Sequence, residues 1–300
     1  MRIDRSHALF AVMCLIWGAT WIAVKAGIST VPPSLFAGTR FIVAGSILLL
    51  FLRWRGDRLG IARTDLPRLV AVTVLMVVAT YALLFWGARF VSSGLAAILD
   101  LAFMPVALLA IGALLGEDRF IPVRACGVAV GVCGLLILLG PKAMSVSGTK
   151  GPTELLGGVA IVLSALVYSL GSVLARPLLR TYPPMLLSGV TLLGGGIVLM
   201  AGALAAEPGA AQALSGRWGT PAWAGWLFLV LFGSLVAFTI YLRLVGEWGA
   251  SRAGAYAFVS PAFAVLLGVW VFGEVVTAVE ALGMATMLAG AWLTLRPAAA

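Results

Sequence analysis

The chain has 300 residues, of which 62% are hydrophobic and only 10% are charged. An ordinary soluble domain has roughly a quarter charged residues, so a chain of this composition would precipitate in water. The formal net charge of +9 does not indicate nucleic-acid binding, because the basic residues lie at the ends of long apolar runs, where they act as topology signals. The composition therefore predicts an integral membrane protein.

Ten apolar segments of about 18 to 24 residues follow one another, and an α-helix of that length crosses roughly 30 Å of hydrocarbon. The first segment is full length and shows no cleavage site, so we expect it to remain as a spanning helix. The sequence thus predicts an all-α integral membrane protein with ten transmembrane helices. The expected spans are 7–27, 33–52, 67–87, 93–115, 123–141, 154–175, 183–205, 221–244, 252–272 and 279–295.

The basic residues divide unevenly between the two sides of the membrane. If both termini are cytoplasmic, 14 Lys and Arg residues fall on the inside and five on the outside, with Arg40 within a helix. Cytoplasmic segments of membrane proteins are enriched in Lys and Arg. The bias therefore predicts that both termini lie in the cytoplasm.

The stretch TVPPSLFAG at residues 30–38 returns 151 positions later as TYPPMLLSG at residues 181–189, and at the same offset Gly45 falls on Gly196. This register indicates a duplication. Each copy holds five spans, an odd number, so the second copy enters the membrane upside down relative to the first. We expect two inverted repeats that alternate access around a shared central site. The expected repeats are residues 1–145 and 146–300.

The fourth and ninth expected spans each carry a proline, Pro105 and Pro261, and each is followed by a Gly-Glu pair, in LLGEDRF and VFGEVVT. A proline within a helix removes a backbone hydrogen bond and bends the helix, so these two residues are the hinge candidates. We expect Glu117 and Glu274, the acids of the two Gly-Glu pairs, at the membrane surface, and a role in a gate is the alternative.

Two charged residues, Arg40 and Asp100, are expected inside the membrane at similar depth, each about seven residues into a span. A charge there is costly unless it is paired or hydrated. One interpretation is an ion pair between Arg40 and Asp100 that holds two helices together. The alternative is functional: Asp100 binds a proton or the ammonium group of a substrate, and Arg40 binds a substrate carboxylate.

Aromatic residues gather on the spans expected to line a substrate path. Trp21 and Phe85 each follow another ring by four positions, so each pair shares a helix face that offers stacking and cation–π contacts to flat or cationic cargo. For any one ring, an interfacial belt or plain core packing is the alternative, and Tyr241, close to Arg243, is expected in the belt. The expected substrate-binding rings are Trp17, Trp21, Tyr81, Phe85 and Tyr168.

Catalytic and cofactor motifs are missing from the sequence. It contains no H-E-x-x-H, no aspartate cluster for magnesium and no G-x-x-x-x-G-K-[ST] loop, so neither an enzyme nor an ATPase is expected, and no cofactor or metal. The three cysteines lie inside apolar segments and are interpreted as small apolar residues. A passive channel would show charged rings or a carbonyl filter, whereas an inverted repeat favours a carrier.

The chain resembles the drug/metabolite transporter superfamily, and within it the EamA-type carriers with ten helices. The resemblance lies in WGATWIAVKAG at residues 17–27, in the following Pro-Pro and Arg40, and in the repeated pattern of a proline followed by Gly-Glu. It implies a cavity lined by the first four helices of each repeat. The branch that looks most similar exports aromatic amino acids from bacteria across the inner membrane.

We therefore expect an inner-membrane secondary transporter that exports aromatic and other neutral amino acids or related small metabolites. The alternative is a broad exporter of organic cations or drugs, and a passive channel ranks third. The expected partners are a small-molecule substrate and the lipid bilayer, with no nucleic acid, and one chain is expected to suffice because ten helices can enclose a pathway.

Overall fold

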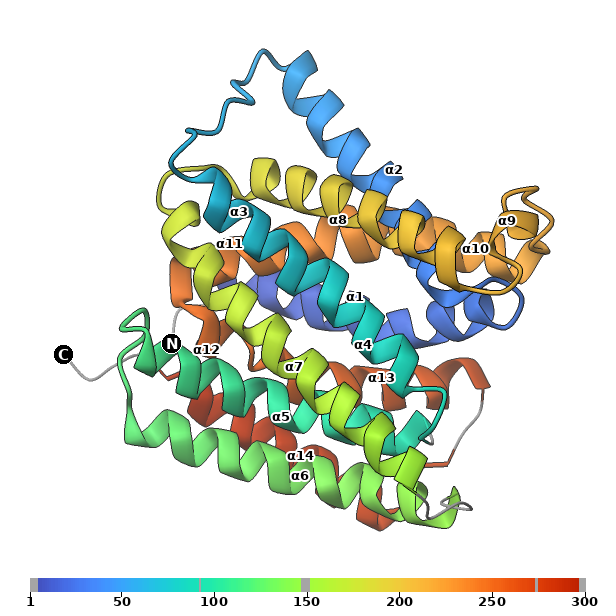
Figure 1. Ribbon diagram of the computed structural model, residues 1–300. Coiled ribbons are helices and arrows are strands. Elements are labelled where there is room, and N and C mark those ends of the chain that lie inside the picture. Colours follow the sequence, from blue (N-terminus) through green and yellow to red (C-terminus); the bar gives the residue numbers. More distant parts are fainter. Residues whose placement is uncertain (1–4, 92, 147–151, 273–274, 297–300) are drawn as a thin grey trace.

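The computed structural model describes residues 5–91, 93–146, 152–272 and 275–296, and within these ranges every regular element is a helix. Figure 1 shows these helices packed as one bundle. The first half contains α1 (Arg5–Ile28), α2 (Pro33–Trp54), α3 (Leu66–Thr73), the π-helix η1 (Val74–Ala79), α4 (Thr80–Gly87), α5 (Ser93–Leu114) and α6 (Pro122–Val146).

The second half repeats this order of long helices. It contains α7 (Pro152–Leu179), α8 (Pro184–Ala206), the short α9 (Ala210–Ala213), α10 (Thr220–Phe228), the π-helix η2 (Leu229–Phe238), α11 (Thr239–Trp248), α12 (Ala250–Ala253), α13 (Tyr256–Phe272) and α14 (Ala278–Thr294). Helices α2, α3, α8 and α10 each have a proline in their first turn, where the missing amide costs nothing.

Nine helical segments of the described chain are long and apolar enough to cross a membrane. The third of these joins α3, η1 and α4 into one rod, and the eighth joins α10, η2 and α11. The tenth expected span corresponds to α14, an apolar helix of 17 residues that is shorter than the other nine. Helix α7 continues to Leu179, beyond the expected end at residue 175, so Arg176 belongs to its last turn.

Helices α2 and α8 pack with their backbones in close contact. A Cβ atom on Gly38 would lie 2.8 Å from the Met200 nitrogen, and one on Gly196 would lie 2.7 Å from the Ile42 nitrogen. Further along α2, a Cβ atom on Gly45 would lie 2.7 Å from the carbonyl oxygen of Gly189. The start of α2 therefore faces the middle of α8 and its middle faces the start of α8, so the two helices are antiparallel.

A second glycine-rich contact joins α6 to α14, and it too pairs a helix of the first half with one of the second. A Cβ atom on Gly127 would lie 2.6 Å from the Thr294 nitrogen, and one on Gly283 would lie 2.7 Å from the Leu138 nitrogen. Between these glycine-rich pairs, α1 packs on α13 and α5 packs on α7. The halves are thus interleaved rather than separate.

The bundle has two ends that different loops close. At the end where α1 begins and α14 ends, called here the terminal end, the Ser6 hydroxyl donates to Glu247 at 2.6 Å and the His7 ring lies 5.0 Å from that of Trp248. At the opposite end, the backbone amide of Ser34 donates to the Glu207 carboxylate at 3.1 Å. Arg89 lies 3.8 Å from the same carboxylate.

Candidate functional site

Four aromatic rings from four different helices meet inside the bundle. Trp17 of α1 lies 4.4 Å from Tyr256 of α13 and 5.4 Å from Tyr241 of α11, measured between ring centroids. Tyr241 in turn lies 5.6 Å from Tyr168 of α7. These tilted and edge-on arrangements are the ones that aromatic rings prefer. Two of the expected rings, Trp17 and Tyr168, therefore belong to one cluster, the central aromatic cluster, which also contains Tyr241 and Tyr256.

The expectation for Tyr241 was wrong. Its side chain is 0% exposed, and its hydroxyl donates a 2.9 Å hydrogen bond to the Ser172 hydroxyl of α7. The ring points into the bundle because α11 presents this face to α7, whereas Arg243, two positions on, is partly exposed and pairs with Glu247 at 2.7 Å. Proximity to a basic residue in sequence therefore misassigned Tyr241 to the interfacial belt.

Arg40 of α2 lies in a pocket of rings. The residue is 6% exposed, and its guanidinium carbon lies 4.2 Å from the centroid of the Phe41 ring and 5.7 Å from that of Tyr81. One terminal nitrogen donates to the Tyr81 hydroxyl at 3.3 Å, while Nε is buried without a partner. Tyr81 also lies 5.6 Å from Phe85, so one expected ring contacts this cation and a second packs against that ring.

Asp100 of α5 is also buried, with 9% of its surface exposed. Among the described residues it has neither a hydrogen bond nor an ion pair, and the expected pair with Arg40 is not formed there. A buried guanidinium without a counter-ion is stabilised by an anion from elsewhere, and a buried carboxyl group either binds a proton or is stabilised by a cation.

Of the hinge candidates, Pro105 follows a residue that contacts the central aromatic cluster, and Pro261 lies on α13, the helix that carries Tyr256. Pro105 is inside α5 and Pro261 is inside α13. The residue before Pro105, Met104, receives a hydrogen bond from the Ser169 hydroxyl at 3.3 Å on its carbonyl, and one from the Tyr256 hydroxyl at 2.9 Å on its sulfur. A change in the bend of α5 at Pro105 would therefore displace groups that are hydrogen-bonded to α7 and α13. The Trp21 side chain and Glu274 lie outside the described residues.

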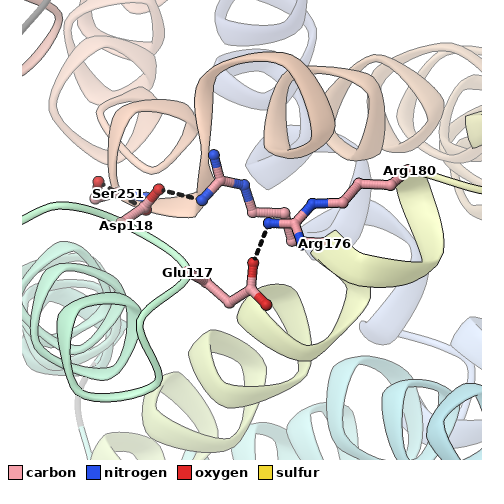
Figure 2. Close-up of polar contacts among 5 residues, drawn as sticks. All are labelled: Glu117, Asp118, Arg176, Arg180 and Ser251. Atoms are coloured by element: carbon pink, nitrogen blue, oxygen red, sulfur yellow. Dashed lines mark hydrogen bonds and ion pairs between the residues drawn. The ribbon is translucent and has the colours of Figure 1, made fainter.

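A polar network at the terminal end was not expected from the sequence. The buried Asp118 carboxylate, in the turn between α5 and α6, accepts a hydrogen bond from Arg176 of α7 at 2.9 Å. Its other oxygen accepts from the backbone amide and the hydroxyl of Ser251 of α12, at 3.0 and 2.9 Å. Figure 2 shows Asp118 between these two partners. One carboxylate thus ties three segments together.

Glu117, next to Asp118, pairs with Arg180 of α7 at 2.7 Å (Figure 2). It was expected at the surface, and its side chain is only partly exposed in this pair. In the matched stretch of the second half, VFGEVVT, the position of Asp118 is taken by Val275, which is 87% exposed. Comparing LLGEDRF with VFGEVVT is the sequence signal that could have identified Asp118.

The two π-helices were also not expected. η1 and η2 each lie in the middle of a spanning rod, the third and the eighth, where a wider turn leaves backbone groups to be satisfied by other partners. The Thr80 hydroxyl donates to the Leu75 carbonyl at 2.7 Å directly after η1. π-Helical turns often occur at functional sites. Tyr81 is the second residue after η1, and Phe238 ends η2.

The sequence profile of the EamA-like transporter family matches this chain twice, over residues 5–140 and 155–296. An uncharacterized inner membrane transporter, YedA of Escherichia coli (strain K12), is 30% identical over 294 residues, which cover 94% of this chain and 87% of that protein. The chloroplastic WAT1-related protein At3g02690 of Arabidopsis thaliana is 27% identical over 285 residues, covering 92% of this chain and 66% of that one.

The fold also matches a solved crystal structure of a protein. That structure has a TM-score of 0.81, covers 97% of both chains and is 19% identical in sequence. At this identity the likeness concerns the fold alone.

Proposed function

This chain belongs to the EamA-like transporter family, and from that premise we propose that it exports aromatic and other neutral amino acids or related small metabolites by alternating access. As a transporter of this family it is not an enzyme. The proposed substrate class is argued from the charged and aromatic side chains inside the bundle.

We propose an architecture of ten membrane helices in two inverted repeats, residues 1–145 and 146–300. The antiparallel packing of α2 on α8 supports it, because the glycines that meet there are the ones matched by the repeat, Gly38 and Gly45 against Gly189 and Gly196. The interleaving supports it as well. If α1 is matched to α7 and α5 to α13, the contact of α1 with α13 corresponds to that of α7 with α5.

The observation that carries the substrate proposal is the pair of uncompensated charges, Arg40 and Asp100. A zwitterion supplies one carboxylate and one ammonium group, the two charges that Arg40 and Asp100 lack as partners. Arg40 takes the carboxylate, since a guanidinium forms strong, directional bonds to that group. Asp100 takes the ammonium group. The rings of Trp17, Tyr81, Phe85 and Tyr168 offer flat faces to an aromatic side chain, and Trp21 remains a further candidate from the sequence.

The alternative substrate class is organic cations or drugs. Asp100 alone would bind the positive charge, and the rings would add cation–π contacts. Arg40 disfavours this alternative, because a second cation near the site repels a cationic substrate unless an anion accompanies it. A passive channel has less support still, since the described charges form no ring around an axis.

We place the protein in a bacterial inner membrane, because its Escherichia coli relative YedA is an inner membrane transporter. The 14 to 5 bias of basic residues supports cytoplasmic termini, which makes the terminal end cytoplasmic. Pro105 and Pro261 would act as hinges, and the Asp118 network would hold the terminal end closed in one of the two states. One chain would suffice for transport.

Counterflow into liposomes tests the proposal. Purified protein is reconstituted, the liposomes are loaded with unlabelled phenylalanine, and uptake of labelled phenylalanine is measured with and without a pH gradient. We expect saturable uptake that tryptophan inhibits. Arg40→Gln and Asp100→Asn should each lower uptake about tenfold or more, because each removes a charge-assisted hydrogen bond of about 1.5–3 kcal/mol.

The matched controls are Arg55→Gln and Asp57→Asn, which change the same charges at exposed positions and should leave uptake unchanged. Failure of phenylalanine and tryptophan to compete would reject the amino acid proposal. Cation uptake that Asp100→Asn abolishes, with zwitterion uptake spared, would establish the alternative class. Linear flux without saturation would indicate a channel.

If Asp100 carries a coupled proton, Asp100→Asn removes the effect of the pH gradient but leaves exchange intact.

A further inference from the structure

A cavity of about 340 Å³ opens at the terminal end, beside the Asp118 network and apart from the transport residues inside the bundle. Its charged lining consists of Glu117, Asp118, Arg119, Arg124, Arg176 and Arg180. Four arginines thus face two acids in one pocket. The Trp248 ring forms part of the wall.

The two acids are already used. Asp118 pairs with Arg176 at 2.9 Å, and Glu117 pairs with Arg180 at 2.7 Å. Neither Arg119 nor Arg124 forms an ion pair within the described part of the chain. The pocket therefore retains two positive charges that no protein group neutralises.

Arg124 is the informative member of the set. It is only 7% exposed, and its Nε donates a hydrogen bond to the Arg296 carbonyl oxygen over a long distance of 3.4 Å. A buried guanidinium that forms no direct ion pair carries a large desolvation cost. The enrichment of basic residues in cytoplasmic loops accounts for exposed arginines such as Arg119. It does not account for a buried one that lines a cavity.

A neighbouring arginine adds to the positive potential. Arg252 of α12 lies with its guanidinium carbon 4.8 Å from the Trp248 ring centroid and donates to the Leu295 carbonyl at 2.9 Å. Its Nε is buried without a partner. Within the residues that the structure describes, Arg252 forms no ion pair either.

We propose that this cavity binds a phosphate group, with Arg124 and Arg119 as its ligands. Arginine suits a phosphate because its planar fork of N–H donors matches two phosphate oxygens. The rim is apolar: Leu114 and Phe120, on either side of the lining turn, are exposed large hydrophobic residues. This rim favours the phosphate of an anionic phospholipid, whose acyl chains would cover it, and free inorganic phosphate shares the same chemistry.

Lipid titration of the detergent-solubilised, delipidated full chain tests the site. Melting temperature is measured against short-chain phosphatidylglycerol, against phosphatidylcholine with the same acyl chains, and against inorganic phosphate. We expect phosphatidylglycerol to raise the melting temperature saturably and phosphatidylcholine to leave it unchanged. Arg124→Gln should weaken the apparent affinity for phosphatidylglycerol about tenfold or more, the loss of one charge-assisted pair.

The control is Arg58→Gln, which removes the same charge from an exposed loop at the same end. Equal affinity of Arg58→Gln and Arg124→Gln for phosphatidylglycerol would overturn the proposal, because it would mean that general surface charge attracts the lipid. Saturable binding of inorganic phosphate that depends on Arg124, without lipid binding, would support the site with a soluble ligand. If Arg124→Gln does not fold, Arg124→Lys and Arg119→Gln carry the same comparison. None of these measurements depends on transport, so they stand apart from the proposed substrate.

Discussion

Asp118 shows how much one buried carboxylate can hold in this protein. It joins the turn after α5 to α7 and to α12 through one ion pair and two hydrogen bonds. Asp118→Asn would leave the partly buried Arg176 without its counter-charge, next to a carboxylate site that is itself buried. We expect the free energy of unfolding to fall by about 3–5 kcal/mol, the usual cost of removing one partner of a buried pair. Thermal unfolding of the solubilised protein measures the loss.

Glu117→Gln is the matched control for that substitution. Its pair with Arg180 lies one position away, but the Arg180 side chain is mostly exposed, and exposed pairs contribute about 0–1 kcal/mol. We expect a correspondingly small change in melting temperature. Equal losses for Asp118→Asn and Glu117→Gln would contradict a special role for the buried network.

The candidate site was only partly readable from the sequence at this scale. Arg40 and Asp100 stood out because a charge within an apolar run is costly wherever the helix lies. The absence of a direct pair between them could not be predicted, because the depth of a residue along its helix does not show toward which neighbouring helix its side chain points. Asp118 lies in a short polar turn beside two other charged residues, where its burial depends on contacts with α7 and α12 that only the folded chain provides.

At the scale of elements, the glycine contact between α2 and α8 leaves no room for a side chain. Gly45→Ala would drive a methyl group into the backbone of α8 at Leu193 and Gly189. We expect a loss of about 1–3 kcal/mol, the range for overpacking a tight contact. Chemical or thermal unfolding in detergent measures it.

Gly202 of α8 provides the control for that prediction. It is also a helical glycine, but a Cβ atom there would meet nothing within 4 Å. Gly202→Ala should therefore be neutral or slightly stabilising, since alanine favours a helix over glycine by up to about 1 kcal/mol. A loss in Gly202→Ala as large as in Gly45→Ala would contradict the packing explanation, because helix propensity favours alanine at both positions.

The helices themselves were the most predictable elements, and their interruptions the least. The length of an apolar run depends on composition alone, so nine spans follow from the sequence with ends good to a few residues. The π-helices η1 and η2 use the same apolar residues as an ordinary α-helix. Their wider turns depend on how neighbouring helices pack, and no local residue pattern encodes that.

At the scale of the whole molecule, the proposed orientation predicts which loops each side of the membrane can reach. In a chain with Cys14, Cys126 and Cys133 replaced by alanine, single cysteines are placed at Arg58 and at Ser215, which are exposed at the terminal and the opposite end. In intact spheroplasts, an impermeant maleimide should label Ser215→Cys but not Arg58→Cys. Permeabilised cells should label both.

The reverse labelling pattern would invert the orientation, and labelling of both positions in intact spheroplasts would contradict the placement of the two loops on opposite faces. The charge bias could suggest this orientation in advance because basic residues act locally, at the ends of each span. The interleaving of the two halves could not be deduced in the same way, since it depends on which helices find each other after insertion.

The glycine seam between α2 and α8 also bears on biosynthesis. Residues 33–54 leave the ribosome well before residues 184–206, so Gly38 and Gly45 meet lipid, not their partner, while the rest of the chain is made. The glycine stripe of α2 is packed against protein only after α8 has been synthesised. The first half therefore cannot complete its packing before the second half is made. Until then, the nascent chain carries a glycine stripe that lacks its partner helix.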